Sequence, residues 1–353
     1  NYYTCGSVIY ATNTGKLIIS HSKKCSILYE ISNLTDTRET TISYSDGPTY
    51  PVTTYTFQYS KTHTRTELES DKSDKGLYAT TDDYGTSYYY RGSVKNNYVY
   101  FAGFYWRIIR INGDGSIRLL YAGENNHSEK DALGIGTSRY NNISNKPLYV
   151  GYMYGNPDGT TSEETNANIH DSTIKSYIDS WYEENLYDYT NYIADSGFCN
   201  DRTLSNASNN GDGVSIDQNT LFSASDRYYT PILICPDQAN DLFTVNNEKG
   251  NRSLKYSIGL ITQDELVYSG IARGYFNSYT YTYSGTHNWT MTPNSFEAAR
   301  QITTNTLISA NASMYNDVIN YLFSTRPVIN LNANVEIESG IGTQNDPFVI
   351  KTT

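Results

Sequence analysis

Charged residues are scarce in this 353-residue chain, at 18% of the total, and no run of lysine or arginine is longer than the pair Lys23-Lys24. The net charge is −11 at pH 7, so the sequence offers no basic footprint for nucleic-acid phosphates or an anionic membrane surface. Long apolar runs are also missing. Those at Pro231–Cys235 and Val99–Trp106 have strand length, far short of the roughly 20 residues of a membrane span. We therefore expect no nucleic-acid partner and no transmembrane segment.

Motifs of known chemistry are absent too. The five histidines are scattered, and neither a G-x-S-x-G elbow, a phosphate-binding loop nor a dinucleotide-binding glycine pattern occurs. A catalytic triad assembled only by folding, or a glycan hydrolase with paired carboxylates in a cleft, stays open as an alternative. The adjacent pairs Glu163-Glu164 and Glu183-Glu184 point in different directions and fit a solvated surface better. We expect no enzyme and no cofactor.

Only four cysteines occur, and they form two pairs that are local in sequence. We expect Cys5–Cys25 and Cys199–Cys235 disulfides, each closing a loop and stabilising the fold by about 3 kcal/mol. Four reduced thiols in a cytosolic protein are the alternative. Because the chain is rich in Ser, Thr, Asn and Tyr, disulfides in an extracellular protein are favoured. The chain begins at Asn1, so we also expect that a leader or anchoring segment has been removed or left out of the numbering.

Tyrosine is abundant, with 36 residues. Its ring suits half-exposed sheets and binding surfaces, and its hydroxyl must stay wet or paired. Together with the low charge, this composition predicts an α+β protein that is mostly β. We place a small β-rich domain or stalk at residues 1–75 and a larger domain at 76–353, joined by the acidic, Ser-rich linker at 66–76.

Local patterns predict several elements. Asn112–Gly115 joins two β runs within residues 88–123, as a hairpin turn does. Apolar residues at helical spacing predict a helix over 172–190. A capping box at Thr262 and Glu265 with Gly270 as a stop predicts a short helix at 263–269. We expect strands at 230–236, a strand, turn and strand at 275–293, and strands after Arg326.

The turn at 209–217 resembles a calcium loop. It contains Asp212 and Asp217 with Asn210 as an amide ligand, whereas calcium takes six to eight oxygens. A structural calcium ion at Asn210, Asp212 and Asp217 is therefore an expectation, with an ordinary loop as the alternative.

Seven blocks carry a family resemblance: YYYRGSVKNNYVYFAGFYWRIIRINGDGSIRLLYAG, PLYVGYMYG, YIADSGFCNDR, LFTV, YSIGLITQDELVYSG, WTMTP and RPVINL. In this order they resemble a family of large surface or secreted bacterial proteins, some with pilin-like leaders. The resemblance covers roughly residues 76–350 and implies a C-type-lectin-like domain with a twisted mixed sheet, two helices and long loops. That fold includes sugar binders, adhesins and formylglycine-generating enzymes. The last need a late cysteine pair, which this chain lacks after Cys235.

By analogy with the adhesins, the resemblance places a ligand surface between Trp289 and Arg326, to which the Tyr-rich run up to Tyr283 adds. Thr292-Pro293-Asn294 lacks the carboxylate of calcium-dependent sugar binders, which puts that activity in doubt. Cross-strand pairing is the alternative role for most of these tyrosines. The expected ligand-binding residues are Tyr283, Trp289, Asn294, Phe296, Arg300, Asn311, Tyr315 and Tyr321.

We expect a non-catalytic extracellular or cell-surface protein for adhesion or recognition, whose partner is a protein or glycan on another surface. The alternative is a subunit of an extracellular filament or pilus that self-assembles with identical subunits. In that case a strand from residues 1–75 would complete a neighbour's sheet.

Overall fold

The computed structural model describes residues 77–126, 133–228, 230–274 and 276–352, and in residues 1–76 it describes only the backbone of five strands. These five strands lie within the β-rich segment expected at residues 1–75. They form a three-stranded sheet, β1-β2-β3, and a β4-β5 pair. Their bounds are Val8–Ala11, Lys16–Ser20, Ile27–Glu30, Leu34–Ile42 and Tyr50–Phe57. No described strand of this group pairs with a strand beyond residue 76, and the domain boundary at 75/76 stays a prediction.

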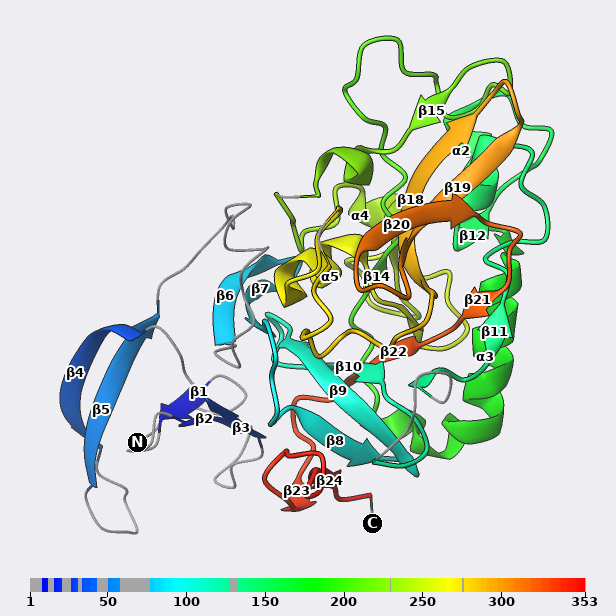
Figure 1. The fold of residues 1–353 in the computed structure, drawn as a ribbon. Coiled ribbons are helices and arrows are strands. Elements are labelled where there is room, and N and C mark those ends of the chain that lie inside the picture. The colour runs from blue at the N-terminus through cyan, green and yellow to red at the C-terminus, as the bar shows by residue number, and fades with distance from the viewer. Residues whose placement is uncertain are drawn as a thin grey trace.

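The rest of the described chain is built on two sheets (Figure 1). The larger has nine strands, in the order β17-β22-β10-β9-β8-β24-β23, with β7 on β9 and β6 on β7. This sheet is mixed. Strand β24 runs parallel to β8, and all other strand pairs of the sheet are antiparallel. Its bounds in chain order are β6 Leu77–Asp82, β7 Gly85–Tyr90, β8 Tyr98–Phe101, β9 Phe104–Ile111, β10 Ile117–Tyr121, β17 Gly259–Leu260, β22 Pro327–Leu331, β23 Ile337–Ser339 and β24 Phe348–Ile350.

The second sheet has the order β11-β21-β18-β19-β20, with β15 on β18. Two further two-stranded pairs, β12-β13 and β14-β16, complete the strands of this region. The bounds are β11 Thr137–Ser138, β12 Met153–Tyr154, β13 His170–Asp171, β14 Phe198–Cys199, β15 Thr220–Leu221, β16 Leu242–Phe243, β18 Asn288–Glu297, β19 Ile302–Ile308, β20 Met314–Val318 and β21 Phe323–Ser324.

Two α-helices exceed one turn in the described chain, and both confirm sequence predictions. The first, α3 (Thr173–Asn185), is capped by the Ser172 side chain and is shorter than expected. The second, α5 (Gln263–Ser269), has the full capping box and ends at Gly270. The remaining helices are single turns or 3₁₀ segments: α2 Ser162–Thr165, α4 Gln238–Asp241, η2 Pro147–Val150, η3 Tyr187–Tyr192 and η4 Ser223–Asp226. The α+β, mostly β class is thus confirmed.

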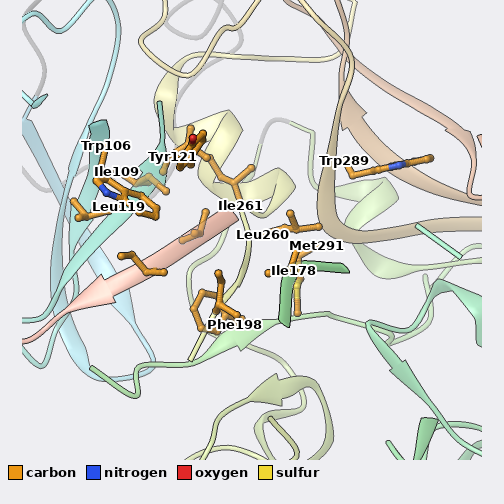
Figure 2. Packing of buried hydrophobic residues seen from close by; sticks show 14 of the residues in the cluster. Trp106, Ile109, Leu119, Tyr121, Ile178, Phe198, Leu260, Ile261, Trp289 and Met291 are labelled. Atoms are coloured by element: carbon orange, nitrogen blue, oxygen red, sulfur yellow. The ribbon is translucent and has the colours of Figure 1, made fainter. Parts of the chain in front are cut away.

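One continuous hydrophobic core holds these elements together. Figure 2 shows side chains that are far apart in sequence gathered there, including Trp106 of β9, Ile178 of α3 and Met291 of β18. Helix α3 contributes Trp181, whose ring lies 5.2 Å from that of Phe104 between centroids. Every residue of α5 is buried, and the helix contacts both β7 of the first sheet and β18 of the second (Figure 1).

Two strand predictions are wrong. Residues 230–236 form no strand and make one isolated bridge, Asp82 with Leu233. Carboxylates take the place of a partner strand there, because Asp264 accepts the Ile232 N–H at 3.0 Å and Asp83 accepts the Cys235 N–H at 2.8 Å. Residues 276–287 are turns and bends and not the first half of a hairpin. Their alternating Thr and Tyr pattern serves tertiary contacts instead.

Candidate ligand-binding groove

A cross-strand pair forms the floor of a surface groove. Strands β8 and β9 are antiparallel, and their register sets Tyr98 directly opposite Arg107. Side chains paired in this way lie on the same face of the sheet. The Arg107 guanidinium consequently lies over the Tyr98 ring, 3.8 Å from its centroid, and 5.5 Å from the centroid of Tyr281. All three side chains line the same open groove.

Arg107 is buried, and the structure describes no counter-ion for it. Only 8% of it is exposed, yet it makes no ion pair with any carboxylate in the described part of the chain. Its Nε donates to Asn97 Oδ1 and its Nη2 to the Val94 carbonyl, both at 2.7 Å. A guanidinium has five N–H donors, so three are left over. Burial lowers the pKa of Arg107, and the neighbouring tyrosines Tyr98 and Tyr281 partly offset that effect.

Arg110 shows what a compensated arginine looks like on the same strand. It is as buried as Arg107, but it pairs with Asp82 at 2.6 Å and with Glu265 at 3.0 Å. Glu265 also pairs with Arg118 at 2.5 Å. A buried charge is normally matched in this way because desolvation is costly. Arg107 departs from that rule.

A second arginine adds positive charge behind the groove. Arg326 is 3% exposed, and its Nε and Nη1 donate to the carbonyls of Tyr121 and Thr282 at 3.0 and 2.7 Å. It too forms no ion pair with a described carboxylate. Burial, and then the charge of Arg107, lower the pKa of Arg326 to about 9. Arg326 therefore remains a cation at neutral pH, and the charge of Arg107 destabilises it.

The segment 279–283 forms an aromatic wall. Tyr279 is 55% exposed, and Tyr283 is half-buried with its hydroxyl donating to the Ala310 carbonyl at 2.9 Å. Tyr281 lies underneath, where burial raises the pKa of its hydroxyl far above the usual range. The segment is tied to the β7–β8 connection, since the Tyr281 N–H donates to the Gly92 carbonyl at 3.1 Å.

The opposite rim comes from the turn between β23 and β24. Thr343, Gln344 and Asn345 line it, and exposed Lys95 stands at the edge. The Tyr98 N–H donates to the Gly342 carbonyl at 2.8 Å, which fixes this turn to the floor. No Asp or Glu of the described chain lines the groove. In a chain of net charge −11, the groove is therefore a locally cationic, aromatic surface rimmed by amides and hydroxyls.

Gly342 offers a test of how this rim is held. Its φ is +82°, and an added Cβ would meet the Phe348 ring and lie 2.7 Å from the Asn96 carbonyl oxygen. We expect Gly342→Ala to lower the free energy of unfolding by about 1–3 kcal/mol through overpacking and backbone strain. Gly103 is a matched control, because its φ is +84° and nothing lies near its added Cβ. Equal losses for both alanine variants in urea titrations would show that the rim does not depend on this close approach.

Most of the ligand-binding residues expected from the sequence lie elsewhere. Tyr283 does line the groove. Trp289, Asn294 and Phe296 are buried, and the Trp289 Nε1–H donates to the Ser138 carbonyl at 3.0 Å. In this structure these three side chains lie in the interior. They are buried because strand β18 is the centre of the second sheet, with β19 on one side and β21 and β15 on the other.

The other four expected residues are exposed but play no part in the groove. Arg300 pairs with Glu297 at 3.5 Å across a tight turn. Asn311 accepts a hydrogen bond from the Ser309 hydroxyl. Tyr315 and Tyr321 are 56% and 52% exposed. These two tyrosines follow β19 in the chain. The groove is built from other segments, namely those around β8, residues 279–283 and the β23–β24 turn.

The turn at 209–217 is held by its own hydrogen bonds. Asp212 Oδ1 accepts the N–H groups of Val214 and Ser215 at 2.9 and 2.7 Å, which lowers the pKa of this carboxyl. The Asn210 amide bonds to the backbone of Ser205 and Leu221. Among the described residues no cluster of three or more His, Cys, Asp or Glu side chains is arranged to hold a metal ion. A calcium ion bound by Asn210, Asp212 and Asp217 stays a prediction.

A second recess lies beside the Cys199–Cys235 disulfide, which is confirmed with a Cα–Cα distance of 5.6 Å. Cys5 and Cys25 lie outside the described residues. Six charged side chains of the recess are matched: Arg110 and Arg118 with Glu265, and Arg227 with Asp201 and Asp264. This arrangement is typical of a structural charge network, and it leaves no unmatched cation like that of the groove.

One sequence signal pointed toward the groove without identifying it. Arg107 and Arg110 interrupt an otherwise apolar strand on opposite faces, which marks both as buried charges. The sequence could not tell which of them has carboxylate partners, because Glu265 lies 155 residues away from Arg110. The Tyr275–Tyr283 run was recognised as an aromatic cluster, but as one part of a surface extending toward Tyr321.

Comparisons with known proteins add nothing to this geometry, since no family model, curated protein or solved structure matches the chain. The helices in the described part of the chain also include none with the length and apolar character to span a membrane.

Proposed function

We propose that this protein is a non-catalytic recognition or adhesion protein of the extracellular space or cell surface, and that it binds a glycan in the groove over Tyr98 and Arg107. The observation that carries the proposal is the composition of the groove. Exposed Tyr279 and half-buried Tyr98 and Tyr283 line an open groove together with amide and hydroxyl side chains. Sugars have apolar C–H faces that stack on aromatic rings, and hydroxyl rims that pair with amides and hydroxyls.

The elements that hold the groove favour recognition over catalysis. The floor comes from paired strands, and the walls are fixed by backbone hydrogen bonds from Tyr98 and Tyr281. A site on rigid elements binds with little ordering cost. The Cys199–Cys235 disulfide supports an oxidising location such as the cell exterior.

The C-type-lectin-like assignment belongs to this proposal. Its support is the resemblance of the sequence blocks together with a mixed sheet, two helices of more than one turn and long loops. The second sheet, with β18 at its centre, is more extensive than we expected from the resemblance.

Tyr279 provides the direct test of the groove. We expect Tyr279→Ala to weaken binding to a responding glycan on an array by roughly 3- to 10-fold, through loss of ring stacking. Tyr279→Phe keeps the ring and should retain most of the affinity. Tyr315→Ala removes an equally exposed tyrosine outside the groove and should leave binding unchanged. If Tyr315→Ala weakened binding and Tyr279→Ala did not, the ligand would lie on the β20 side and the proposed site would be wrong.

Assembly into a filament remains the alternative, and one feature of the backbone favours it. Strands β1–β5 pair only with one another among the described strands, so their outer edges offer backbone groups to another chain. Negative-stain microscopy with light scattering under oxidising conditions tests this. Regular filaments that lose order when residues 1–75 are deleted would support assembly, whereas a monodisperse monomer would exclude it.

A further inference from the structure

The unmatched guanidinium of Arg107 indicates more than a generic sugar site. Resting on the proposed function, we infer that the ligand is a saccharide that carries a carboxylate, and that this carboxylate binds Arg107 at the floor of the groove.

The Arg107 cation has no carboxylate partner among the described residues. The buried arginines Arg110, Arg118 and Arg202 and the largely buried Arg227 each contact at least one carboxylate, whereas Arg107 and Arg326 pair with none that the structure describes. Arg107 contacts only neutral oxygens, those of Asn97 and Val94. Neutral acceptors position the guanidinium but do not offset its charge. A bound anion would offset that charge.

The Arg107 guanidinium is positioned to receive an anion. Hydrogen bonds occupy Nε and one donor of Nη2, and they leave both donors of Nη1 and one of Nη2. The free donors are on the end of the fork, which can hold a carboxylate through two parallel N–H···O bonds. The Tyr98 ring, 3.8 Å from the guanidinium carbon, holds the fork in place.

The charges around Arg107 also favour an anionic ligand. Lys95 adds a second cation at the rim, and no carboxylate among the described residues lines the groove to repel an anion. Behind the groove, Arg326 has its pKa lowered by burial and by Arg107, and a bound anion would relieve this repulsion. The overall charge of −11 opposes polyanions at long range. It therefore favours a ligand with a single acidic group over a densely sulfated chain.

The remaining lining of the groove fits a saccharide better than a simple organic acid. Besides the guanidinium, the groove is lined by Tyr279 and Tyr283 and by the amides of Gln344 and Asn345. A small acid would leave these surfaces unused. A carboxylated sugar would place its acidic group on Arg107 and its ring and hydroxyls along the tyrosines and amides.

Paired saccharides that differ in the acidic group test the inference on the unaltered protein. We would measure binding by calorimetry for 3′-sialyllactose against lactose, and for methyl glucuronide against methyl glucoside. The carboxylated member of a pair should bind roughly 10- to 100-fold more tightly, the range for a hydrogen bond to a charged group. Lactose 3′-sulfate distinguishes a carboxylate site from a general anion site, and tighter binding of the sulfate than of 3′-sialyllactose would overturn the inference.

Variants then assign the preference to Arg107. Arg107→Gln should abolish the difference between the acidic and neutral sugars, and Arg107→Lys should keep part of it. Arg300→Gln is the matched control, since it removes an exposed arginine outside the groove. Circular dichroism and melting curves establish that each variant is folded.

The outcomes separate the inference from the function on which it rests. Equal binding of acidic and neutral sugars, weakened alike by Tyr279→Ala, would overturn the carboxylate inference and leave glycan recognition standing. If none of these sugars and no member of a glycan array bound the unaltered protein, both would be overturned. A preference for acidic sugars that survives in Arg107→Gln would place the carboxylate elsewhere and contradict the inference.

Discussion

Glu265→Gln is expected to lower the free energy of unfolding by about 3–5 kcal/mol, as breaking a buried ion pair does. This carboxylate is 2% exposed and pairs with both Arg110 and Arg118. It also accepts the Thr262 N–H at 3.0 Å and so closes the capping box of α5. Glutamine retains the shape but leaves Arg118 without a described counter-ion, and the cost of burying that charge appears as lost stability.

The same residue predicts how stability depends on pH. Burial by itself raises the pKa of Glu265, but the charges of Arg118 and Arg110 outweigh it, so the pKa lies below the usual glutamate value of 4.5. A carboxyl with a lowered folded-state pKa stabilises the fold above its unfolded-state pKa. This stabilisation is lost as the pH falls from about 4.5 through the folded-state pKa. In Glu265→Gln this part of the acid dependence should be missing.

Urea titrations at pH 7 and between pH 3 and 5 measure both effects. Glu183→Gln is the control, because Glu183 pairs with Lys255 at 3.0 Å on the exposed surface. It should leave the stability at pH 7 unchanged within error. A Glu265→Gln variant as stable as the parent, with the same acid dependence, would show that the network around α5 does not hold the fold.

Trp289→Ala is expected to destabilise the protein by about 3–5 kcal/mol, the range for removing a large aromatic side chain from a core. The ring is fully buried and lies 5.9 and 5.0 Å from the rings of Tyr140 and Phe323 between centroids. Its N–H bond to the Ser138 carbonyl would be lost as well. Trp289→Phe, which keeps an aromatic ring, should cost less.

This substitution also separates two interpretations of the same residue. The sequence suggested Trp289 as a ligand contact, whereas the structure places it in the core. Thermal melting should therefore show a large loss, while the fraction that stays folded should bind the ligand with unchanged affinity. Weaker binding without loss of stability would restore the sequence-based interpretation.

The sequence predicted best those features that depend on neighbouring residues. The Asn112–Gly115 hairpin, the helix that begins near residue 172 and the box of Thr262 and Glu265 each rest on a few neighbouring side chains. The strand expected at 230–236 failed because carboxylates from Asp83 and Asp264 satisfy its backbone. No local pattern reveals a partner that distant in the chain.

The candidate groove shows the same limit. It brings together residues 93–98, 279–283 and 343–345, whose proximity follows from the parallel pairing of β24 with β8 and from the bond between Tyr281 and Gly92. The alternation of Tyr and Thr identified one wall. The decisive feature is a buried arginine that pairs with no carboxylate in the described part of the chain, and it depends on where the fold places every acidic side chain.

A co-crystal structure tests the central claim most directly. The protein would be crystallised with the carboxylated saccharide that binds most tightly, 3′-sialyllactose or methyl glucuronide. We expect its carboxylate within hydrogen-bond distance of Arg107 and its sugar ring along Tyr98 and Tyr279. A saccharide bound instead beside Tyr315 and Tyr321, with the groove empty at saturating concentration, would contradict the account.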